Sequence, residues 1–124
     1  MIRVHTIDWT AAADGSVADI PIDELFLTGY GYSLHSMVTD PGAGATAPSD
    51  NYDITIEDVD GVDVLGGAGN NRDAANTERV MPLYGTTPHP CPINGALTVK
   101  IAGNIVNAAT GKIKLYFVRM AAGY

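Results

Sequence analysis

Three acidic side chains at short spacing form the strongest candidate for metal chemistry in this chain: Asp58, Asp60 and Asp63. Calcium sites gather carboxylates in this way, but a helix-loop-helix calcium loop needs a ligand at its fifth position and a glutamate at its twelfth. Counted from Asp58, those positions hold Val62 and Gly69. An Asp-Gly hairpin turn accounts for the same residues. We therefore predict a turn rather than a metal site, with Asp63 facing solvent beside a buried Val62 or Val64.

A second candidate is the proline-rich stretch that holds His89 and Cys91, two residues apart. A structural zinc site takes four ligands, and the chain has no second cysteine, so symmetry-related copies would have to supply the rest. Cys91 could act as a nucleophile with a histidine as its base, but no local signature of such an enzyme surrounds it. We predict a rigid loop with a buried thiol, and neither a catalytic residue nor a cofactor. The remaining nucleophiles and bases lie outside any such signature as well: His5, His35, Ser16, Ser33, Ser36 and Ser49.

Other binding chemistries have less support. The glycines of the run 66–69 lack the Gly-Lys-Ser/Thr ending, and the following helix, that a phosphate-binding loop needs. The chain is rich in aspartate, but abundance does not place two carboxylates across a glycosidic bond. Six tyrosines and Trp9 could form a platform on which sugars stack, although packing in a core or an interface explains these aromatic residues better.

The size and composition of the chain predict one soluble domain, spanning residues 1–124. A chain of this length buries roughly two-thirds of the surface that it exposes when unfolded. The 46% hydrophobic fraction excludes a wholly disordered chain, while 14 glycines and 7 prolines predict many turns. The single cysteine indicates a reducing compartment. The first residues lack the apolar segment of a secretory signal, and no run approaches the roughly 18 apolar residues of a membrane helix.

Charge is distributed unevenly along the chain. Residues 1–63 hold twelve acids against Arg3 alone, whereas residues 64–124 hold six bases against two acids, and the formal net charge is −7. An acidic chain with scattered bases repels phosphate, which disfavours binding to nucleic acid or to a membrane surface. Two interpretations of the asymmetry remain open. The two halves complement each other within one fold, or patches of opposite sign meet between identical subunits.

Alternation of apolar and polar residues predicts about eight short strands and no amphipathic helix. The clearest strand covers 51–57, where Tyr52, Ile54 and Ile56 share one side. A strand at 25–39 is expected to bend or bulge at Gly29 and Gly31, because glycine weakens a strand interior. His35 in that strand is expected to be a core or interface histidine. The predicted hairpins join 1–9 with 17–22, 51–57 with 62–65, and 96–102 with 112–119, and one further strand covers 79–84.

These strands predict an all-β fold, a single-domain antiparallel β-sandwich or a jelly-roll-like barrel. Three long irregular segments are expected at 40–50, 66–77 and 85–92. The last of them has three prolines within five residues, which predicts a stiff loop with a polyproline tendency. Such a loop loses little conformational freedom on docking, and we therefore expect it to act as a contact arm.

Turn and strand phrases along most of the chain carry a resemblance to a known class of proteins. These are Asp40-Pro-Gly, Pro48-Ser-Asp-Asn-Tyr-Asp53, Asp58-Val-Asp-Gly-Val-Asp-Val-Leu-Gly66 and Ala109-Thr-Gly-Lys-Ile-Lys-Leu-Tyr116. With them the chain resembles small β-rich virion proteins of tailed bacteriophages. The resemblance implies a structural part of a virus particle: a capsid decoration or cement protein present as a trimer or another small oligomer, or a part of a head fibre, knob or tail.

The predicted function is therefore non-enzymatic. We expect a decoration or cement protein, made in the host cytoplasm and located in the virion, that stabilises the head lattice as a small homo-oligomer, with a trimer favoured. Its expected partners are copies of itself and the major capsid protein or other virion proteins, with no nucleic acid and no membrane. The alternative is a carbohydrate-binding or adhesin-type module of a head fibre, knob or tail component. For neither function does the resemblance supply a site motif.

Overall fold

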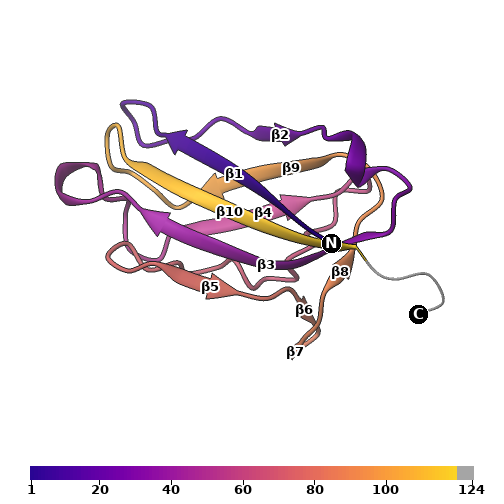
Figure 1. The fold of residues 1–124 in the computed structure, drawn as a ribbon. Coiled ribbons are helices and arrows are strands. Elements are labelled where there is room, and N and C mark those ends of the chain that lie inside the picture. Colours follow the sequence, from indigo (N-terminus) through magenta and orange to yellow (C-terminus); the bar gives the residue numbers. More distant parts are fainter. Residues whose placement is uncertain (120–124) are drawn as a thin grey trace.

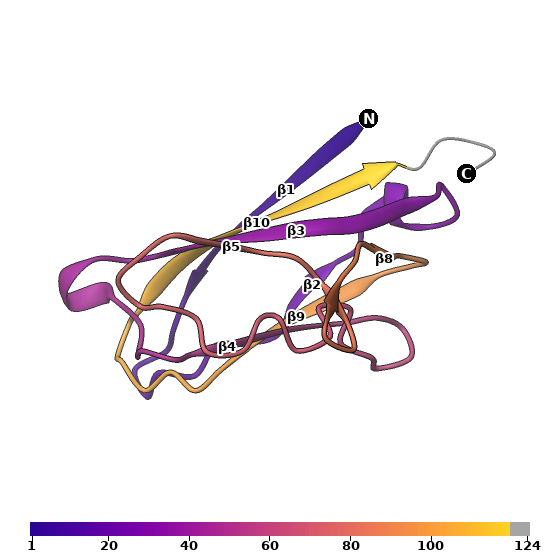
Figure 2. The same ribbon diagram turned by 90° about the horizontal axis from the view of Figure 1, so that it is seen from below.

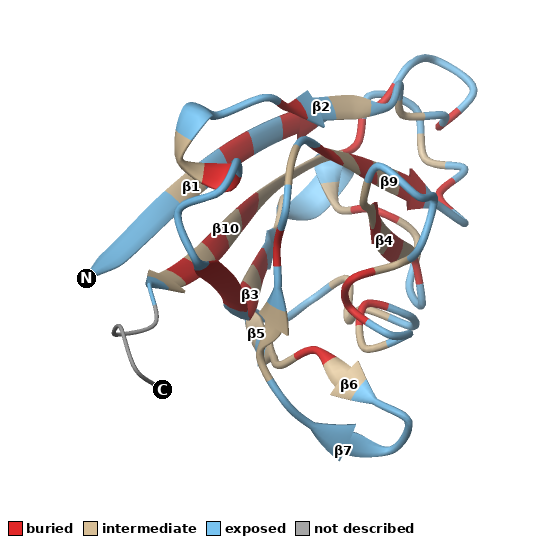
Figure 3. Cartoon of the chain, turned by 90° about the vertical axis from the view of Figure 1, so that its right-hand side faces the viewer, coloured by how far each residue is buried: buried red, intermediate tan, exposed pale blue. Residues whose placement is uncertain are grey.

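The computed structural model describes residues 1–119, and these form an antiparallel β-sandwich (Figure 1). The larger sheet has the strand order β1-β10-β3-β5, with β8 also paired to β3, and the smaller sheet has the order β2-β9-β4. A two-stranded ribbon, β6-β7, projects from the sandwich (Figure 3). The strands are β1 (Ile2–Thr10), β2 (Ile20–Ile22), β3 (Tyr32–Pro41), β4 (Asp53–Glu57), β5 (Glu78–Val80), β6 (Leu83–Tyr84), β7 (Thr87–Pro88), β8 (Cys91–Pro92), β9 (Leu97–Ala102) and β10 (Thr110–Arg119). The predicted all-β class and the sandwich are confirmed.

The core lies between the two sheets, which Figure 2 shows as two separate layers. Period-two alternation places the apolar residues of each long strand on its inner side. In β4, Ile54 and Ile56 are fully buried, while Asp53, Thr55 and Glu57 are partly exposed. β9 and β10 contribute in the same way, and each fully buried Leu, Ile or Phe side chain adds roughly 1.5–3 kcal/mol of stabilisation. Their inward residues are Leu97, Val99, Ile101, Ile113, Leu115 and Phe117.

Two of the three predicted hairpins are wrong. β1 pairs with β10 and β2 pairs with β9, so the first two strands belong to different sheets. Likewise β9 pairs with β2 and β4, whereas β10 pairs with β1 and β3. Thr110 and Gly111, which lie just before the predicted strand at 112–119, already belong to β10. Alternation determines which side of a strand is buried, but it leaves the partner strand open.

The predicted hairpin of 51–57 with 62–65 forms only in part. β4 forms as expected, and the chain turns back against its end through an antiparallel bridge between Glu57 and Asp63 and the backbone hydrogen bond from Val64 to Ile56, but 62–65 form no strand. Val64 and Leu65 are buried and continue into a series of turns, while Val62 is 59% exposed.

The predicted strand at 25–39 begins late. Leu25–Leu27 form a short 3-10 helix, and Gly29 and Gly31 adopt φ angles of +74° and +73°, which only glycine tolerates readily. The glycine pair therefore forms a turn before β3 begins at Tyr32. A bulge does occur in β3, but at His35, which is skipped where Tyr116 pairs with Ser36 and Phe117 with Leu34.

The irregular segments differ in part from prediction. The segment 66–77 lies outside the strands as expected, whereas 40–50 includes the end of β3 and a short 3-10 helix at Gly44–Thr46. The proline-rich segment 85–92 is not a polyproline loop. It completes the β6-β7 ribbon and then supplies β8: Pro88 and Pro92 fall on these short strands, where proline is tolerated, and Pro90 lies between them. The predicted strand at 79–84 is divided between β5 and β6.

No helix among residues 1–119 has the length and hydropathy needed to cross a membrane.

Candidate interaction site

The carboxylates that suggested a cation loop are used in holding backbone turns. Asp58 Oδ1 accepts hydrogen bonds from the backbone N–H groups of Asp60 and Val62, at 2.9 and 3.1 Å. Asp63 was expected to face solvent, but its two carboxylate oxygens accept from the N–H groups of Ile56, Leu65 and Gly67, at 3.0, 3.1 and 3.0 Å. Across residues 1–119 there is no group of three or more side chains arranged to hold a metal ion. The carboxylates of Asp58 and Asp63 therefore stabilise the backbone around the Asp-Gly turn.

His89 and Cys91 line the same apolar cavity of about 440 Å³, together with Val62, Leu83 and Tyr84. Their side chains face backbone carbonyls: His89 Nδ1 lies 2.7 Å from the carbonyl of Pro90, and Cys91 Sγ lies 3.6 Å from that of Pro92. Burial raises the pKa of the Cys91 thiol, and the charges of Asp58 and Asp63 raise it further. A raised pKa keeps the thiol protonated at neutral pH, which is the opposite of what a nucleophile needs. The thiol is half-buried rather than buried as predicted.

The other histidines and serines do not converge with Cys91. His5 Nδ1 lies 3.5 Å from Glu24, and His35 is exposed on the bulge of β3, so the predicted core position is wrong while the interface position stays a prediction. His35 Nδ1 lies 3.2 Å from Ser36 Oγ, but that hydroxyl is fully buried and accepts a hydrogen bond from Arg79. The remaining serines have structural partners or lie in the core: Ser16 with Asp14, Ser49 with Asn104 and Ile105, and Ser33 in β3.

The glycines at 66–69 serve close packing of the backbone. A β-carbon on Gly66 would collide with the carbonyl of Leu83, and one on Gly69 with the carbonyl of Ile54. Packing of aromatic residues in a core, which the sequence favoured over a sugar-stacking platform, is confirmed for Trp9, Tyr32 and Tyr52, which are 3%, 4% and 1% exposed. These three aromatic residues belong to the core.

The charge asymmetry is at least partly resolved within the fold. Ion pairs join the acidic first half to the basic second half: Lys112 with Asp8 at 3.8 Å, and Lys100 with Asp19 and Glu57 at 3.8 and 3.5 Å. All of them are partly exposed, so each contributes roughly 0–1 kcal/mol.

The first strand provides the largest unpaired backbone surface of the larger sheet. β1 lies at the end of the strand order, and within residues 1–119 its outer edge has no partner strand. The N–H of Arg119 donates to the carbonyl of Met1 at 3.1 Å, which makes this pair the hydrogen-bonded kind. Because the two kinds of pair alternate along an antiparallel ladder, the odd residues of β1 bond to β10. The N–H and C=O groups of its even residues face outward from the edge: Ile2, Val4, Thr6 and Asp8.

The N-terminal end of β1 is also apolar and exposed. Met1, Ile2 and Val4 are 72%, 65% and 51% exposed, and we call these three residues the apolar tip. Figure 2 shows this end of β1 rising away from the smaller sheet, and Figure 3 shows it uncovered. Edge strands are commonly protected by proline, lysine or a bulge, but β1 contains neither residue and pairs with β10 without a register shift. The geometry is suited to pairing with a strand of another chain.

Sequence reasoning missed the role of β1, because it assigned this strand a hairpin partner instead of an edge. A signal was present in the sequence: the first ten residues alternate without a proline, lysine or glycine. Its partner on the inner side, β10, lies between 100 and 116 residues further along the chain (Thr10 with Thr110, Ile2 with Val118), and local sequence does not indicate a pairing over that separation.

Comparisons with known proteins give no family. No protein-family model matches the chain, and no curated protein matches it. Among solved structures, the chain is similar to a chain of the cyanophage Pam1 capsid asymmetric unit, with a TM-score of 0.49 and 11% sequence identity. The alignment covers 97% of this chain and 84% of that chain. A likeness this slight carries no argument about function.

Proposed function

We propose that the chain is a non-enzymatic structural protein of a tailed-phage virion, a decoration or cement subunit that forms a small homo-oligomer, with a trimer favoured. The observation that carries the proposal is the unpaired edge of β1 with its apolar tip. Exposed apolar surface next to open backbone groups is stabilised by burial against another protein. The sequence resemblance supplies the setting, a phage head in which the major capsid protein is the second partner.

A cement subunit has to contact both its own copies and the shell, which requires two separate surfaces. The apolar tip is one. The cavity beside the β6-β7 ribbon is a second, because Val62 and Tyr84 on its margin are 59% and 85% exposed. Standard interfaces bury about 800 Å² per partner, and an edge strand with its flanking side chains can form the core of one such contact. Charged side chains between these two surfaces contribute to the orientation of the bound partners more than to the affinity of binding.

Two measurements on the purified chain test the proposal. Size-exclusion chromatography with light scattering should give a stable small oligomer, and the protein should co-sediment with expanded empty capsids. Val4→Lys should weaken self-association at least tenfold, since it places a charge on the apolar tip. Thr10→Lys is the matched control, because Thr10 is exposed on the same strand and the same side but far from the tip. The proposal would be overturned if the chain stayed monomeric at high concentration and did not co-sediment with capsids.

Counting copies in purified particles by mass spectrometry tests the decoration role separately from self-association. Hundreds of copies per virion are expected for a protein that covers the head lattice. A dozen or fewer would place the chain at a vertex or in the tail and contradict the decoration role.

A further inference from the structure

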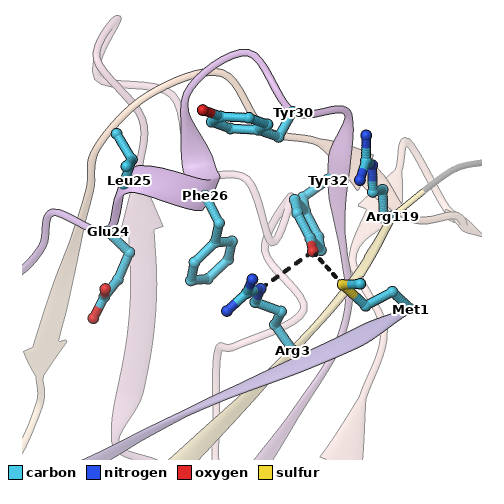
Figure 4. A pocket seen from close by; sticks show the side chains of 8 residues that line it. All are labelled: Met1, Arg3, Glu24, Leu25, Phe26, Tyr30, Tyr32 and Arg119. Carbon is cyan, nitrogen blue, oxygen red and sulfur yellow. Dashed lines mark hydrogen bonds between the residues drawn. The ribbon is translucent and has the colours of Figure 1, made fainter.

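A second feature is an open pocket of about 460 Å³ at the same end of the sandwich, which shares Met1 with the apolar tip (Figure 4). Pockets that hold small ligands have volumes of roughly 300–1,000 Å³. Side chains from the start of β1, the end of β10 and the segment before β3 converge on it. They combine two guanidinium groups, three aromatic rings, one carboxylate and two aliphatic side chains: Arg3, Arg119, Phe26, Tyr30, Tyr32, Glu24, Leu25 and Met1.

One guanidinium in the pocket is held in place with its terminal nitrogens free. Arg3 Nε donates to the Tyr32 hydroxyl at 3.2 Å, and that hydroxyl in turn donates to Met1 Sδ at 3.0 Å. The guanidinium also lies over the ring of Phe26, with Cζ 5.3 Å from the ring centroid. Within the described part of the chain, neither terminal nitrogen of Arg3 has a hydrogen-bond or ion-pair partner. A fixed guanidinium with two open donors is arranged for an anion with two oxygens.

A second guanidinium reaches the same pocket from β10. Figure 4 shows Arg119 on the far side of Tyr32 from Phe26. Among residues 1–119, Arg119 has no carboxylate within ion-pair distance. Two guanidinium groups on either side of Tyr32, neither of them in an ion pair within residues 1–119, outnumber the one carboxylate of the pocket and favour a ligand with negative charge.

The aromatic side chains provide apolar surface of defined shape. Phe26 is held by edge-to-face contacts with Tyr32 and Phe117, with centroids 5.1 and 5.4 Å apart. Tyr30 is 48% exposed and stands between Gly29 and Gly31. At both glycines a β-carbon would meet open space, so the turn needs them for their positive φ and not for room. The Gly-Tyr-Gly turn thus presents an aromatic ring beside the pocket, where a ring-shaped ligand can pack.

The carboxylate of Glu24 narrows the class of ligand. It lies 3.5 Å from His5 and remains 47% exposed, so it can accept hydrogen bonds from hydroxyl groups. It would repel a strongly charged ligand such as a phosphate dianion more than a single carboxylate. A plain fatty acid has no hydroxyl group to donate to Glu24. A hydroxylated ring with one carboxylate has a group for each part of the pocket: the carboxylate for the guanidinium groups, the ring for the aromatic side chains and the hydroxyls for Glu24.

We propose that this pocket binds a carboxylate-bearing sugar unit, with Arg3 on its carboxylate, Arg119 adding positive charge from the other side of Tyr32, Phe26 and Tyr30 against its ring and Glu24 on its hydroxyls. This activity goes beyond the assembly role and does not depend on it. It gives the chain a means of attaching to acidic surface glycans.

The test is an NMR titration of the full chain with glucuronic acid and, in parallel, with glucose. Glucuronic acid should shift the ring resonances of Tyr30 and the Nε resonance of Arg3, and it should bind at least tenfold more tightly than glucose. Arg119→Gln and Tyr30→Ala should each weaken binding at least fivefold. Lys112→Gln is the matched control, since Lys112 pairs with Asp8 away from the pocket and its loss should leave binding unchanged.

Three outcomes would overturn the proposal: no binding of glucuronic acid, equal binding of glucose, or binding that survives both pocket variants. Tighter binding of an acidic peptide than of any acidic glycan on an array would also overturn it, because it would identify a protein ligand. Thermal unfolding of each variant verifies that it is folded. These results leave the assembly proposal unaffected, because self-association is measured on the same samples by light scattering.

Discussion

The indole ring of Trp9 lies directly over Gly111, its register partner on the neighbouring strand. A β-carbon on Gly111 would lie 2.5 Å from Nε1 and Cε2 of Trp9 and 2.6 Å from Cζ2. The ring is 3% exposed and packs at a tilt against Tyr52, with centroids 6.0 Å apart, so it cannot move aside freely. Gly111 therefore provides the space that the only tryptophan of the chain occupies in the core.

Gly111→Ala should lower the free energy of unfolding by about 1–3 kcal/mol, the cost of forcing an extra methyl group into a packed core. Urea unfolding followed by tryptophan fluorescence measures the change. In a Trp9→Leu background, followed by circular dichroism, the same substitution should cost clearly less, because the clash is then absent. Equal costs in the two backgrounds would mean that the ring does not restrict position 111.

Asp63→Ala should be the most destabilising single change among the surface aspartates. It removes a carboxylate that accepts from three backbone N–H groups, those of Ile56, Leu65 and Gly67. Hydrogen bonds to charged groups contribute roughly 1.5–3 kcal/mol each and are not additive, so a total loss of about 3 kcal/mol is expected. Asp60→Ala is the control, because among residues 1–119 its carboxylate accepts no hydrogen bond, and it should change stability by less than about 0.5 kcal/mol. Similar losses in the two variants would contradict the structural role of Asp63.

Stability should decline in alkaline solution because of Tyr52. Burial raises the pKa of the Tyr52 phenol above its value in the unfolded chain, which is roughly 10. Its contribution to stability is therefore complete below that pH and is lost as the pH rises toward the folded-state pKa. Urea unfolding between pH 8 and 11 should show the decline, and Tyr52→Phe should make it shallower. Both chains should carry Cys91→Ala, because burial also raises the pKa of that thiol. An unchanged slope in the phenylalanine variant would refute the assignment.

Local patterns in the sequence predicted the strands but not their partners. Period-two alternation placed Ile54, Ile56 and Phe117 in the core, because facing inward depends only on neighbours in the chain. Pairing depends on how distant strands pack, and for this reason the hairpins of 1–9 with 17–22 and of 96–102 with 112–119 were predicted wrongly.

The sites were predictable to a smaller extent. The Asp-Gly turn followed from local turn chemistry, and the bonds of Asp63 to the N–H groups of Leu65 and Gly67, two and four residues further on, are of the same local kind. Its bond from the N–H of Ile56 requires the return of the chain against β4, which no local rule indicates. The pocket formed by Arg3, Phe26 and Arg119 brings together residues from the two ends of the chain. Only Gly29-Tyr-Gly31 carried a sequence signal, and it indicated a turn more directly than the bulge that was predicted from it.

The exposed edge of β1 can be tested by a substitution that leaves its paired side intact. Thr6 points its N–H outward from the sheet, so Thr6→Pro removes no hydrogen bond to β10 and should leave the free energy of unfolding within about 1 kcal/mol of the wild type. It removes a donor and adds a ring on the outer edge, which should weaken self-association at least tenfold in light scattering. His5→Pro is the opposite case. His5 pairs with Leu115 through the inner ladder, so this change should cost about 1–3 kcal/mol of stability. A Thr6→Pro protein that keeps the wild-type oligomer would show that copies meet elsewhere, and the cavity beside the β6-β7 ribbon would then be the surface to change next.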